Sequence, residues 1–109
     1  MATQGLVTVR SKSDGKVLMK IVAGCDGYNA QRVANILRAS WPVSVGQAYT
    51  MAREIGFGSN EDLVVITATE VRFDGDYDLG PLYRSTFEQP EFNPRWEHGT
   101  ADNVVVIDV

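Results

Sequence analysis

The stretch Gly24-Cys25-Asp26-Gly27-Tyr28-Asn29 marks the point where the chain changes character. The residues before it are rich in β-branched side chains and read as strands. The residues after it repeat apolar side chains at intervals of three and four, which is typical of an amphipathic helix. Two glycines in six residues give the backbone room to change direction. We therefore take these six residues as the junction around which the fold is organised.

A β-hairpin is predicted before this junction. Two β-rich runs flank residues 11–16, and their apolar members are Leu6, Val7, Val9, Val17, Leu18, Ile21 and Val22. Between the runs, Asp14-Gly15 is a pair that readily adopts the positive φ of a tight hairpin turn. Because side chains alternate along a strand, Leu6 points to one face of the sheet and Val7 and Val9 to the other. We expect both faces to be partly covered.

A first helix is predicted directly after the junction. Its apolar face is formed by Ala30, Val33, Ala34 and Leu37. Either Asp26 or Asn29 is placed to cap its first turn. The helix should end at Trp41-Pro42, because the residue before a proline is disfavoured in helical conformation.

A second helix should follow at once. Ser44 and Gln47 have the spacing of a capping box, in which each side chain binds the other residue's backbone N–H group. The apolar face of this helix consists of Val45, Ala48, Tyr49, Ala52 and Ile55. Gly56 and Gly58 provide its exit.

The remaining strands are predicted in the second half of the chain. Residues 63–69 form the most strongly β-forming run, and its continuous apolar character predicts a central strand that is covered on both faces. Residues 71–73 and 82–84 flank an acidic turn and are candidates for further strands. Residues 85–102 show neither the two-residue repeat of a strand nor the 3.6-residue repeat of a helix, which predicts an irregular segment held to the fold by its aromatic side chains. Residues 104–107 are then predicted to form a last strand.

These elements predict an α+β fold in a single domain spanning residues 1–109. An N-terminal β-hairpin and two helices would pack on one face of a mainly antiparallel sheet of four to six strands. An open edge of such a sheet favours pairing into a homodimer.

Composition limits the classes of function. The chain has 109 residues and a formal net charge of −4, which argues against binding to nucleic acid or anionic lipid and favours a basic or amphipathic protein partner. It contains no apolar run long enough to span a membrane and no basic segment followed by an apolar one. Cys25 is the only cysteine, so no internal disulfide forms and we expect a cytoplasmic protein.

The candidate binding residues lie in two places. Asp26, Gly27 and Tyr28 form the first set, because a carboxylate between two glycines at a strand-to-helix junction has room around it and backbone N–H groups nearby. The alternative is that Asp26 only caps the helix. Cys25 is a poor nucleophile candidate, because a neighbouring carboxylate disfavours the thiolate and the only histidine, His98, is distant in sequence.

The second set is the acidic turn, with Asp74, Asp76 and Asp78. Their alternation resembles the start of a calcium loop, but Leu79 and Ser85 stand where that loop requires glycine and glutamate. We expect a solvated turn that serves as contact surface. No metal site, cofactor site or catalytic motif is predicted.

Thr3-Gln4-Gly5-Leu6, Asp14-Gly15 and Cys25-Asp26-Gly27-Tyr28 occur in an order that resembles a group of small, uncharacterised proteins encoded by phages and bacteria. Those proteins open with a Thr-Arg-Gly-Leu-like strand and reach an aromatic-Asp-Gly-Tyr-Pro loop before a helix. Here Gln4 replaces the arginine, Cys25 the aromatic residue and Asn29 the proline. The resemblance implies a phage or mobile-element setting and supplies no function.

A second resemblance is to proteasome-type N-terminal nucleophile hydrolases, whose mature chains begin at a threonine and run into a hairpin. It implies Thr3 as the nucleophile, exposed by removal of Met1 and Ala2, with Lys20 as the nearby lysine. The leading hypothesis is a small acidic binding module, and the first resemblance implies a phage-encoded or mobile-element modulator of a host protein. The alternatives are such a hydrolase, or a small anionic-ligand binder at the start of the first helix.

Overall fold

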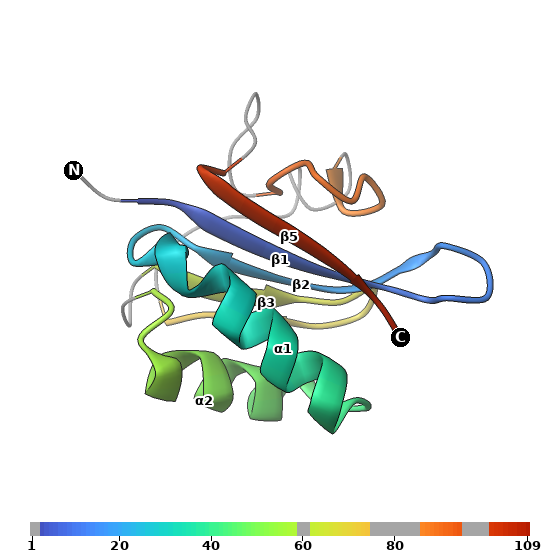
Figure 1. Cartoon of the computed structure of the whole chain (residues 1–109), viewed down its shortest axis with the longest axis horizontal. Coiled ribbons are helices and arrows are strands. Elements are labelled where there is room, and N and C mark those ends of the chain that lie inside the picture. The colour runs from blue at the N-terminus through green and yellow to red at the C-terminus, as the bar shows by residue number, and fades with distance from the viewer. Residues whose placement is uncertain (1–2, 59–61, 75–85, 95–100) are drawn as a thin grey trace.

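The sheet is built outward from the N-terminal hairpin, as the computed structural model shows for residues 3–58, 62–74, 86–94 and 101–109 (Figure 1). Strands β1 (Gly5–Arg10) and β2 (Val17–Ala23) pair antiparallel. β3 (Leu63–Ile66) pairs antiparallel with β2, and β4 (Val71–Arg72) with β3. β5 (Asn103–Asp108) pairs parallel with β1. The described residues therefore form a mainly antiparallel, five-stranded sheet in the order β4-β3-β2-β1-β5.

The hairpin turn follows the sequence prediction. Gly15 has a φ of 73°, and the Asp14 carboxylate accepts a hydrogen bond from the Lys16 backbone N–H at 3.0 Å. This hydrogen bond is the main reason that the pKa of Asp14 lies below its usual value. The Asp14-Gly15 pair therefore sets the turn in the expected way.

Both predicted helices are present, and both pack on one face of the sheet, which makes the fold α+β. They are α1 (Ala30–Ser40) and α2 (Val45–Ile55). At the start of α2 the Gln47 backbone N–H donates to the Ser44 hydroxyl at 3.1 Å, and the Ser44 backbone N–H donates to the Gln47 side chain at 2.8 Å. Gly56 ends α2 with a φ of 85°. The capping box and the glycine exit are confirmed.

The predicted side-chain cap of α1 is wrong. A short 3₁₀ helix, η1 (Gly27–Asn29), stands between the junction and α1, and neither Asp26 nor Asn29 makes a side-chain cap in the described structure. The extra turn moves Asp26 away from the first N–H groups of α1. The Asn29 amide instead donates to the Gly56 carbonyl at 3.2 Å.

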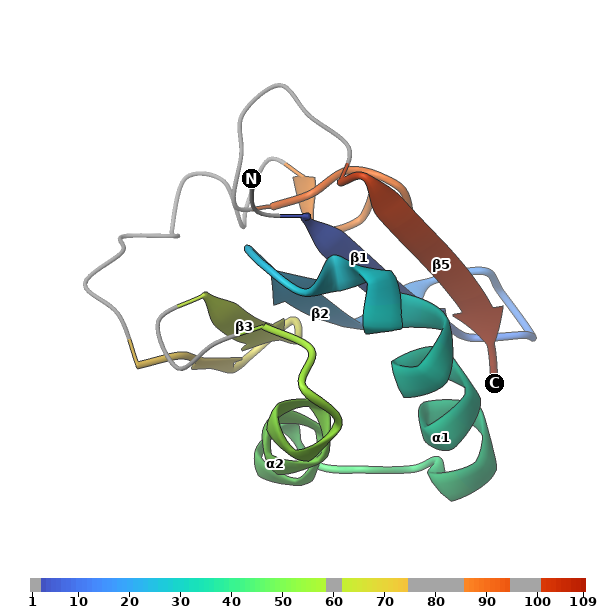
Figure 2. The same cartoon turned by 60° about the vertical axis from the view of Figure 1, so that its left-hand side comes forward.

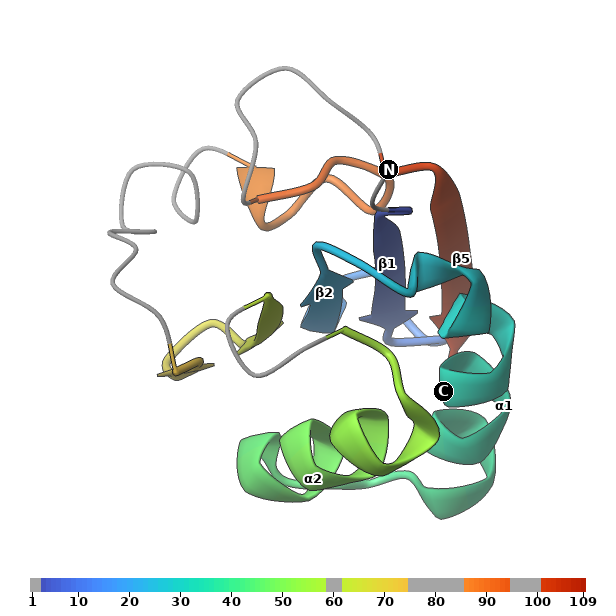
Figure 3. The ribbon, with the colours of Figure 1, turned by 90° about the vertical axis from the view of Figure 1, so that its left-hand side faces the viewer.

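The sheet is covered on both faces because its strands alternate apolar side chains between them. Figure 3 shows α1 and α2 on one side of the sheet and residues 86–94 on the other, which we call the back face. The core under the helices includes Val7, Val9, Ile21, Leu37, Tyr49, Phe57, Val65 and Ile107. A second core on the back face consists of Leu6, Val17, Val22, Val64, Ile66, Phe87 and Ala101.

The later strands differ in detail from the prediction. β3 is fully buried, as expected, but it ends at Ile66, because residues 67–70 form a turn in which the Thr67 hydroxyl accepts the Glu70 backbone N–H at 3.0 Å. It is an interior strand, but β2 holds the central place. The predicted strand at 82–84 lies outside the described residues. Phe87 is buried and pins the segment that follows.

Candidate functional site

The junction between β2 and α1 is a loop held to three other parts of the fold (Figure 2). Two backbone N–H groups and one side-chain amide of the loop donate hydrogen bonds to backbone carbonyls elsewhere in the fold. These run from the Gly24 N–H to the Asp62 carbonyl (3.2 Å), from the Gly27 N–H to the Thr3 carbonyl (2.8 Å) and from the Asn29 amide to the Gly56 carbonyl (3.2 Å). The loop is thus tied to the segments next to β1 and β3 and to the end of α2.

Gly27 is required at its position by packing. A Cβ atom built there would lie 2.2 Å from the carbonyl carbon of Gln4 and 2.3 Å from the nitrogen of Gly5. A Cβ on Gly5 would in turn lie 2.6 Å from the Gly27 Cα. Two glycines therefore let the loop and the start of β1 approach more closely than any side chain would permit.

The two side chains that flank Gly27 face solvent. Asp26 is exposed and has a left-handed backbone conformation, with φ 55° and ψ 28°, which is uncommon outside glycine. Tyr28 is 67% exposed, the largest exposure among the big apolar side chains of the described residues. An anchored backbone thus presents a carboxylate and an aromatic ring to solvent, side by side in sequence.

Asp74 belongs to a different cluster. Its carboxylate accepts a hydrogen bond from the buried Tyr49 hydroxyl at 3.0 Å, and the guanidinium carbons of Arg72 and Arg53 lie 4.9 and 5.8 Å from the centre of the Tyr49 ring. Burial, followed by the bond to Asp74, raises the pKa of Tyr49. Asp74 therefore helps to hold α2 to β4 as well as facing solvent.

The sheet brings Asp26 and Asp74 to one end. β2 and β4 run in the same direction on either side of β3, so the residues that follow them emerge at the same end of the sheet, about 10 Å apart across β3. β3 and β5 begin at this end, which adds Asp62 and Asp102. We call it the acidic end. Asp76 and Asp78 lie outside the described residues.

The sequence analysis named Lys20 only for the hydrolase alternative and did not predict that it lies fully buried on the back face of β2. Its ammonium donates to the backbone carbonyls of Thr86 (3.0 Å), Gln89 (2.5 Å) and Phe92 (2.6 Å). Thr8, the residue of β1 that pairs with Lys20, donates its hydroxyl to the Pro90 carbonyl at 2.6 Å. Burial lowers the pKa of Lys20 to about 8. A lysine inside the apolar run 17–23 was the signal that could have revealed a buried partner.

The hydrolase alternative gains no support from this arrangement. Lys20 pairs across the hairpin with Thr8, five residues or about 17 Å along the chain from Thr3. Its ammonium is occupied by three carbonyls. Cys25 is half-buried, with its sulfur 3.9 Å from the Asp26 carboxylate, a neighbour that disfavours the thiolate.

The anionic-ligand alternative meets an unfavourable environment as well. The Asn29 N–H donates to the Asp26 carbonyl and the Ala30 N–H to the Gly27 carbonyl, so two N–H groups at this helix start are already used. Asp26, which precedes this helix start in the chain, is exposed, and its negative charge disfavours an anion in this region.

Neither a metal-binding cluster nor a membrane-spanning helix occurs in the part of the chain that the structure describes. That part contains no group of three or more histidine, cysteine, aspartate or glutamate side chains able to hold a metal ion. None of its helices has the length and apolar character needed to cross a membrane.

Comparison of the chain with protein-family models, with curated proteins and with solved structures found no match.

Proposed function

We propose that this protein is a small binding module that recognises another protein through the Asp26-Gly27-Tyr28 loop at the acidic end of its sheet. The observation that supports this most directly is the 67% exposure of Tyr28 on a loop fixed at three points. Tyrosine is enriched among the residues that dominate protein interfaces, because its ring buries a large area and its hydroxyl still finds a polar partner.

The rigidity of the loop favours recognition over a purely structural role. Binding through a fixed backbone loses less conformational entropy than binding through a mobile one. Asp26 makes no cap for the helix, yet it occupies a left-handed conformation that glycine would adopt more readily. Its carboxylate is exposed beside Tyr28 in the sequence, where a partner can reach both side chains.

The partner should present a basic or amphipathic surface. Asp26, Asp62, Asp74 and Asp102 all lie at the acidic end, and the chain as a whole has a net charge of −4. A cationic side chain of the partner would pair with Asp26 while an apolar or cationic group packs on Tyr28. The resemblance to small phage and bacterial proteins favours a host protein as this partner and a role as its modulator.

The test is a pull-down from bacterial lysate with three folded baits, followed by mass spectrometry. They are the wild type, Asp26→Ala/Tyr28→Ala, and the matched control Glu70→Ala/Val71→Ala. The control removes an exposed carboxylate and the other large exposed apolar side chain of the described residues, Val71, which is 42% exposed. The proposal expects a partner that the loop variant alone fails to recover. Equal recovery by all three baits would place the contact surface elsewhere.

A further inference from the structure

β5 forms one edge of the sheet and leaves half of its backbone groups directed outward. The Asn103 N–H donates to the Gln4 carbonyl and the Val109 N–H to the Arg10 carbonyl, so the odd-numbered residues of β5 face β1. Since the N–H and C=O groups of successive residues in a strand point to opposite sides, those of Val104, Val106 and Asp108 point away from the sheet. They line the outer side of the edge in the part of the chain that the structure describes.

This edge lacks the usual protection against strand pairing. Its sequence, Asn-Val-Val-Val-Ile-Asp, contains no lysine, proline or glycine. The single charge, on Asp108, is paired with Arg10 of the neighbouring strand at 3.0 Å. Val104 and Val106 are only partly buried on the back face. In the part of the chain that the structure describes, a regular, valine-rich strand of six residues is thus open to a further strand.

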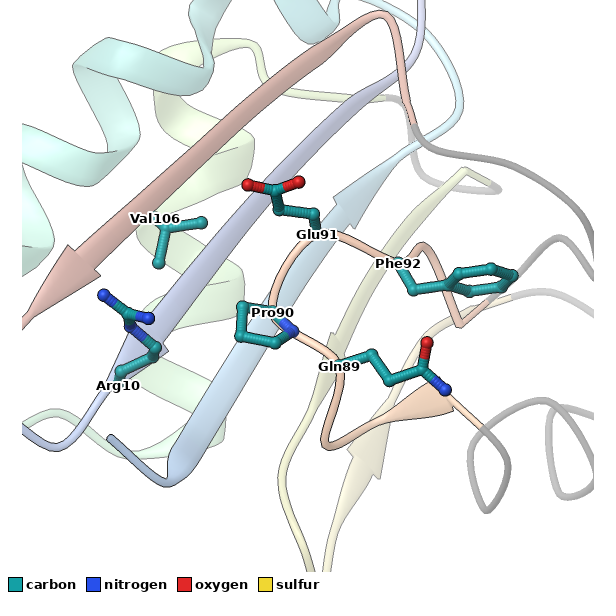
Figure 4. Close-up of a pocket in the computed structure, with 6 residues that line it drawn as sticks. All are labelled: Arg10, Gln89, Pro90, Glu91, Phe92 and Val106. Atoms are coloured by element: carbon teal, nitrogen blue, oxygen red, sulfur yellow. The ribbon is translucent and has the colours of Figure 1, made fainter. Parts of the chain in front are cut away.

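A groove of about 480 Å³ lies beside the same edge on the back face. Figure 4 shows Arg10 and Val106 on the strands facing Pro90 and Glu91 of the segment above them, whereas the ring of Phe92 points away. Among the described residues, segment 86–94 therefore covers the middle of the back face and leaves the β5 side uncovered. A strand added to β5 would extend the floor of this groove.

We propose that β5 pairs antiparallel with β5 of a second copy of this chain, with Val106 opposite Val106. The three outward-facing residues are symmetric about Val106. A two-fold axis there lets the two Val106 residues exchange backbone hydrogen bonds and pairs Val104 of each copy with Asp108 of the other. Two five-stranded sheets would join into one continuous sheet.

Charge complementarity favours this arrangement over parallel pairing. β5 begins at the acidic end and finishes beside the hairpin end, where Arg10, Lys12 and Lys16 lie. Antiparallel pairing brings Asp102 of one copy close to Lys12 of the other, because Lys12 is bonded to Val109, which lies opposite Asn103 in this register. It also separates the two Asp108 carboxylates by four residues, or about 13 Å along the strand.

The first test is sedimentation equilibrium over protein concentrations from about 1 to 500 µM, because a single strand pair is a small interface and a reversible dimer is expected. Val106→Pro removes the outward N–H without touching the pairing with β1 and should leave a monomer. Val106→Thr keeps the N–H and the side-chain shape and should still dimerise. A wild type that stays monomeric over the whole concentration range would overturn the proposal. So would a Val106→Pro variant that dimerises as well as the wild type and Val106→Thr.

The second test fixes the register and does not depend on the proline variant folding. In a Cys25→Ser background, Val106→Cys and Val104→Cys are oxidised by dissolved oxygen with a copper catalyst. Paired Cα atoms in an antiparallel strand lie within the range that a disulfide spans, so Val106→Cys should form covalent dimers on a denaturing gel. Val104→Cys should not, because its counterpart is Asp108. Equal cross-linking of the two variants would contradict the Val106-centred register.

Discussion

Replacing Lys20 with methionine should release segment 86–94 from the back face and lower the free energy of unfolding by about 3 kcal/mol. The ammonium is fully buried and donates to three carbonyls of that segment. Hydrogen bonds to charged groups contribute about 1.5–3 kcal/mol each, which gives about 5–9 kcal/mol for three. Burial opposes the charged form and lowers the pKa from 10.5 to about 8, which offsets part of that gain.

In the Lys20→Met variant, segment 86–94 can limit the loss of stability by detaching from the sheet, so the change should appear in that segment. If the carbonyls stayed in place they would be buried without a donor, so we expect the segment to open to water instead, giving up the burial of Phe87, which is worth about 2 kcal/mol. The β1-β2 hairpin and the helix-face core should remain intact.

Urea unfolding followed by circular dichroism measures the total, and hydrogen exchange with mass spectrometry locates it. Lys20→Met should speed exchange in residues 86–94 while the helices keep their protection. Lys12→Met, at an exposed position in the hairpin turn, is the matched control and should change stability by less than about 0.5 kcal/mol. If Lys20→Met is as stable as wild type and its segment stays protected, the three hydrogen bonds do not hold the segment.

The same lysine predicts a dependence of stability on pH. Its folded-state pKa, about 8, lies below its unfolded value of 10.5, so between these pH values the unfolded chain binds more protons. The free energy of unfolding should therefore rise with pH across this window. Below pH 8 both states are protonated and the contribution is constant. The neutral amine still offers two N–H donors to the segment. Subtracting the Lys20→Met profile isolates this residue, and a difference that is flat or falls with pH would refute the lowered pKa.

Five further substitutions test the Asp26-Gly27-Tyr28 loop, the Tyr49-Asp74 contact and a control position in α2, each by urea unfolding. Gly27→Ala should cost about 2–3 kcal/mol, because its Cβ would lie 2.2 Å from a backbone carbon, whereas Gly46→Ala, with no atom closer than 4.0 Å, should gain about 0.5 kcal/mol in α2. Tyr49→Phe should cost about 1 kcal/mol by losing its hydrogen bond, and Asp74→Asn, which keeps an acceptor oxygen, should cost less. Asp26→Gly should raise stability by up to about 1 kcal/mol if its left-handed conformation is strained; an unchanged or lower stability would remove that support for an external role.

The parts of the fold that could be predicted are those encoded within a few residues. Asp14-Gly15 specifies a turn by its own backbone preference, and Ser44 with Gln47 caps α2 through contacts three residues apart. The parallel pairing of β1 with β5 joins residues about a hundred positions apart, and no local pattern encodes it. The cap assigned to Asp26 was wrong for a related reason: the interposed η1 is stabilised by contacts of the loop with residues near β1 and α2.

In the candidate site too, the features encoded within a few residues could be predicted, and those that depend on contacts distant in sequence could not. The sequence indicated that Asp26, Gly27 and Tyr28 form a loop, but not that Tyr28 faces solvent, since an aromatic residue beside an amphipathic helix is as easily part of the core. The need for glycine at position 27 arises from its contact with the start of β1. The role of Lys20 in holding segment 86–94 was not predicted, because its carbonyl partners lie in a segment with no periodic pattern and nothing in the sequence connects the two.

The two proposed surfaces share only Asp102, and each can be tested through residues that the other does not use. The loop lies at the acidic end of the sheet, whereas the β5 contact runs along its side. An antiparallel β5 pair would place the two loops at opposite ends of the joined sheet, so each would bind its own partner molecule, one per chain. Asp26→Ala/Tyr28→Ala should therefore lose the partner and still dimerise. Val106→Pro should become monomeric and still recover the partner. If either variant lost both properties while remaining folded, the two surfaces would have to be coupled, and a single interface spanning the loop and β5 would replace both proposals.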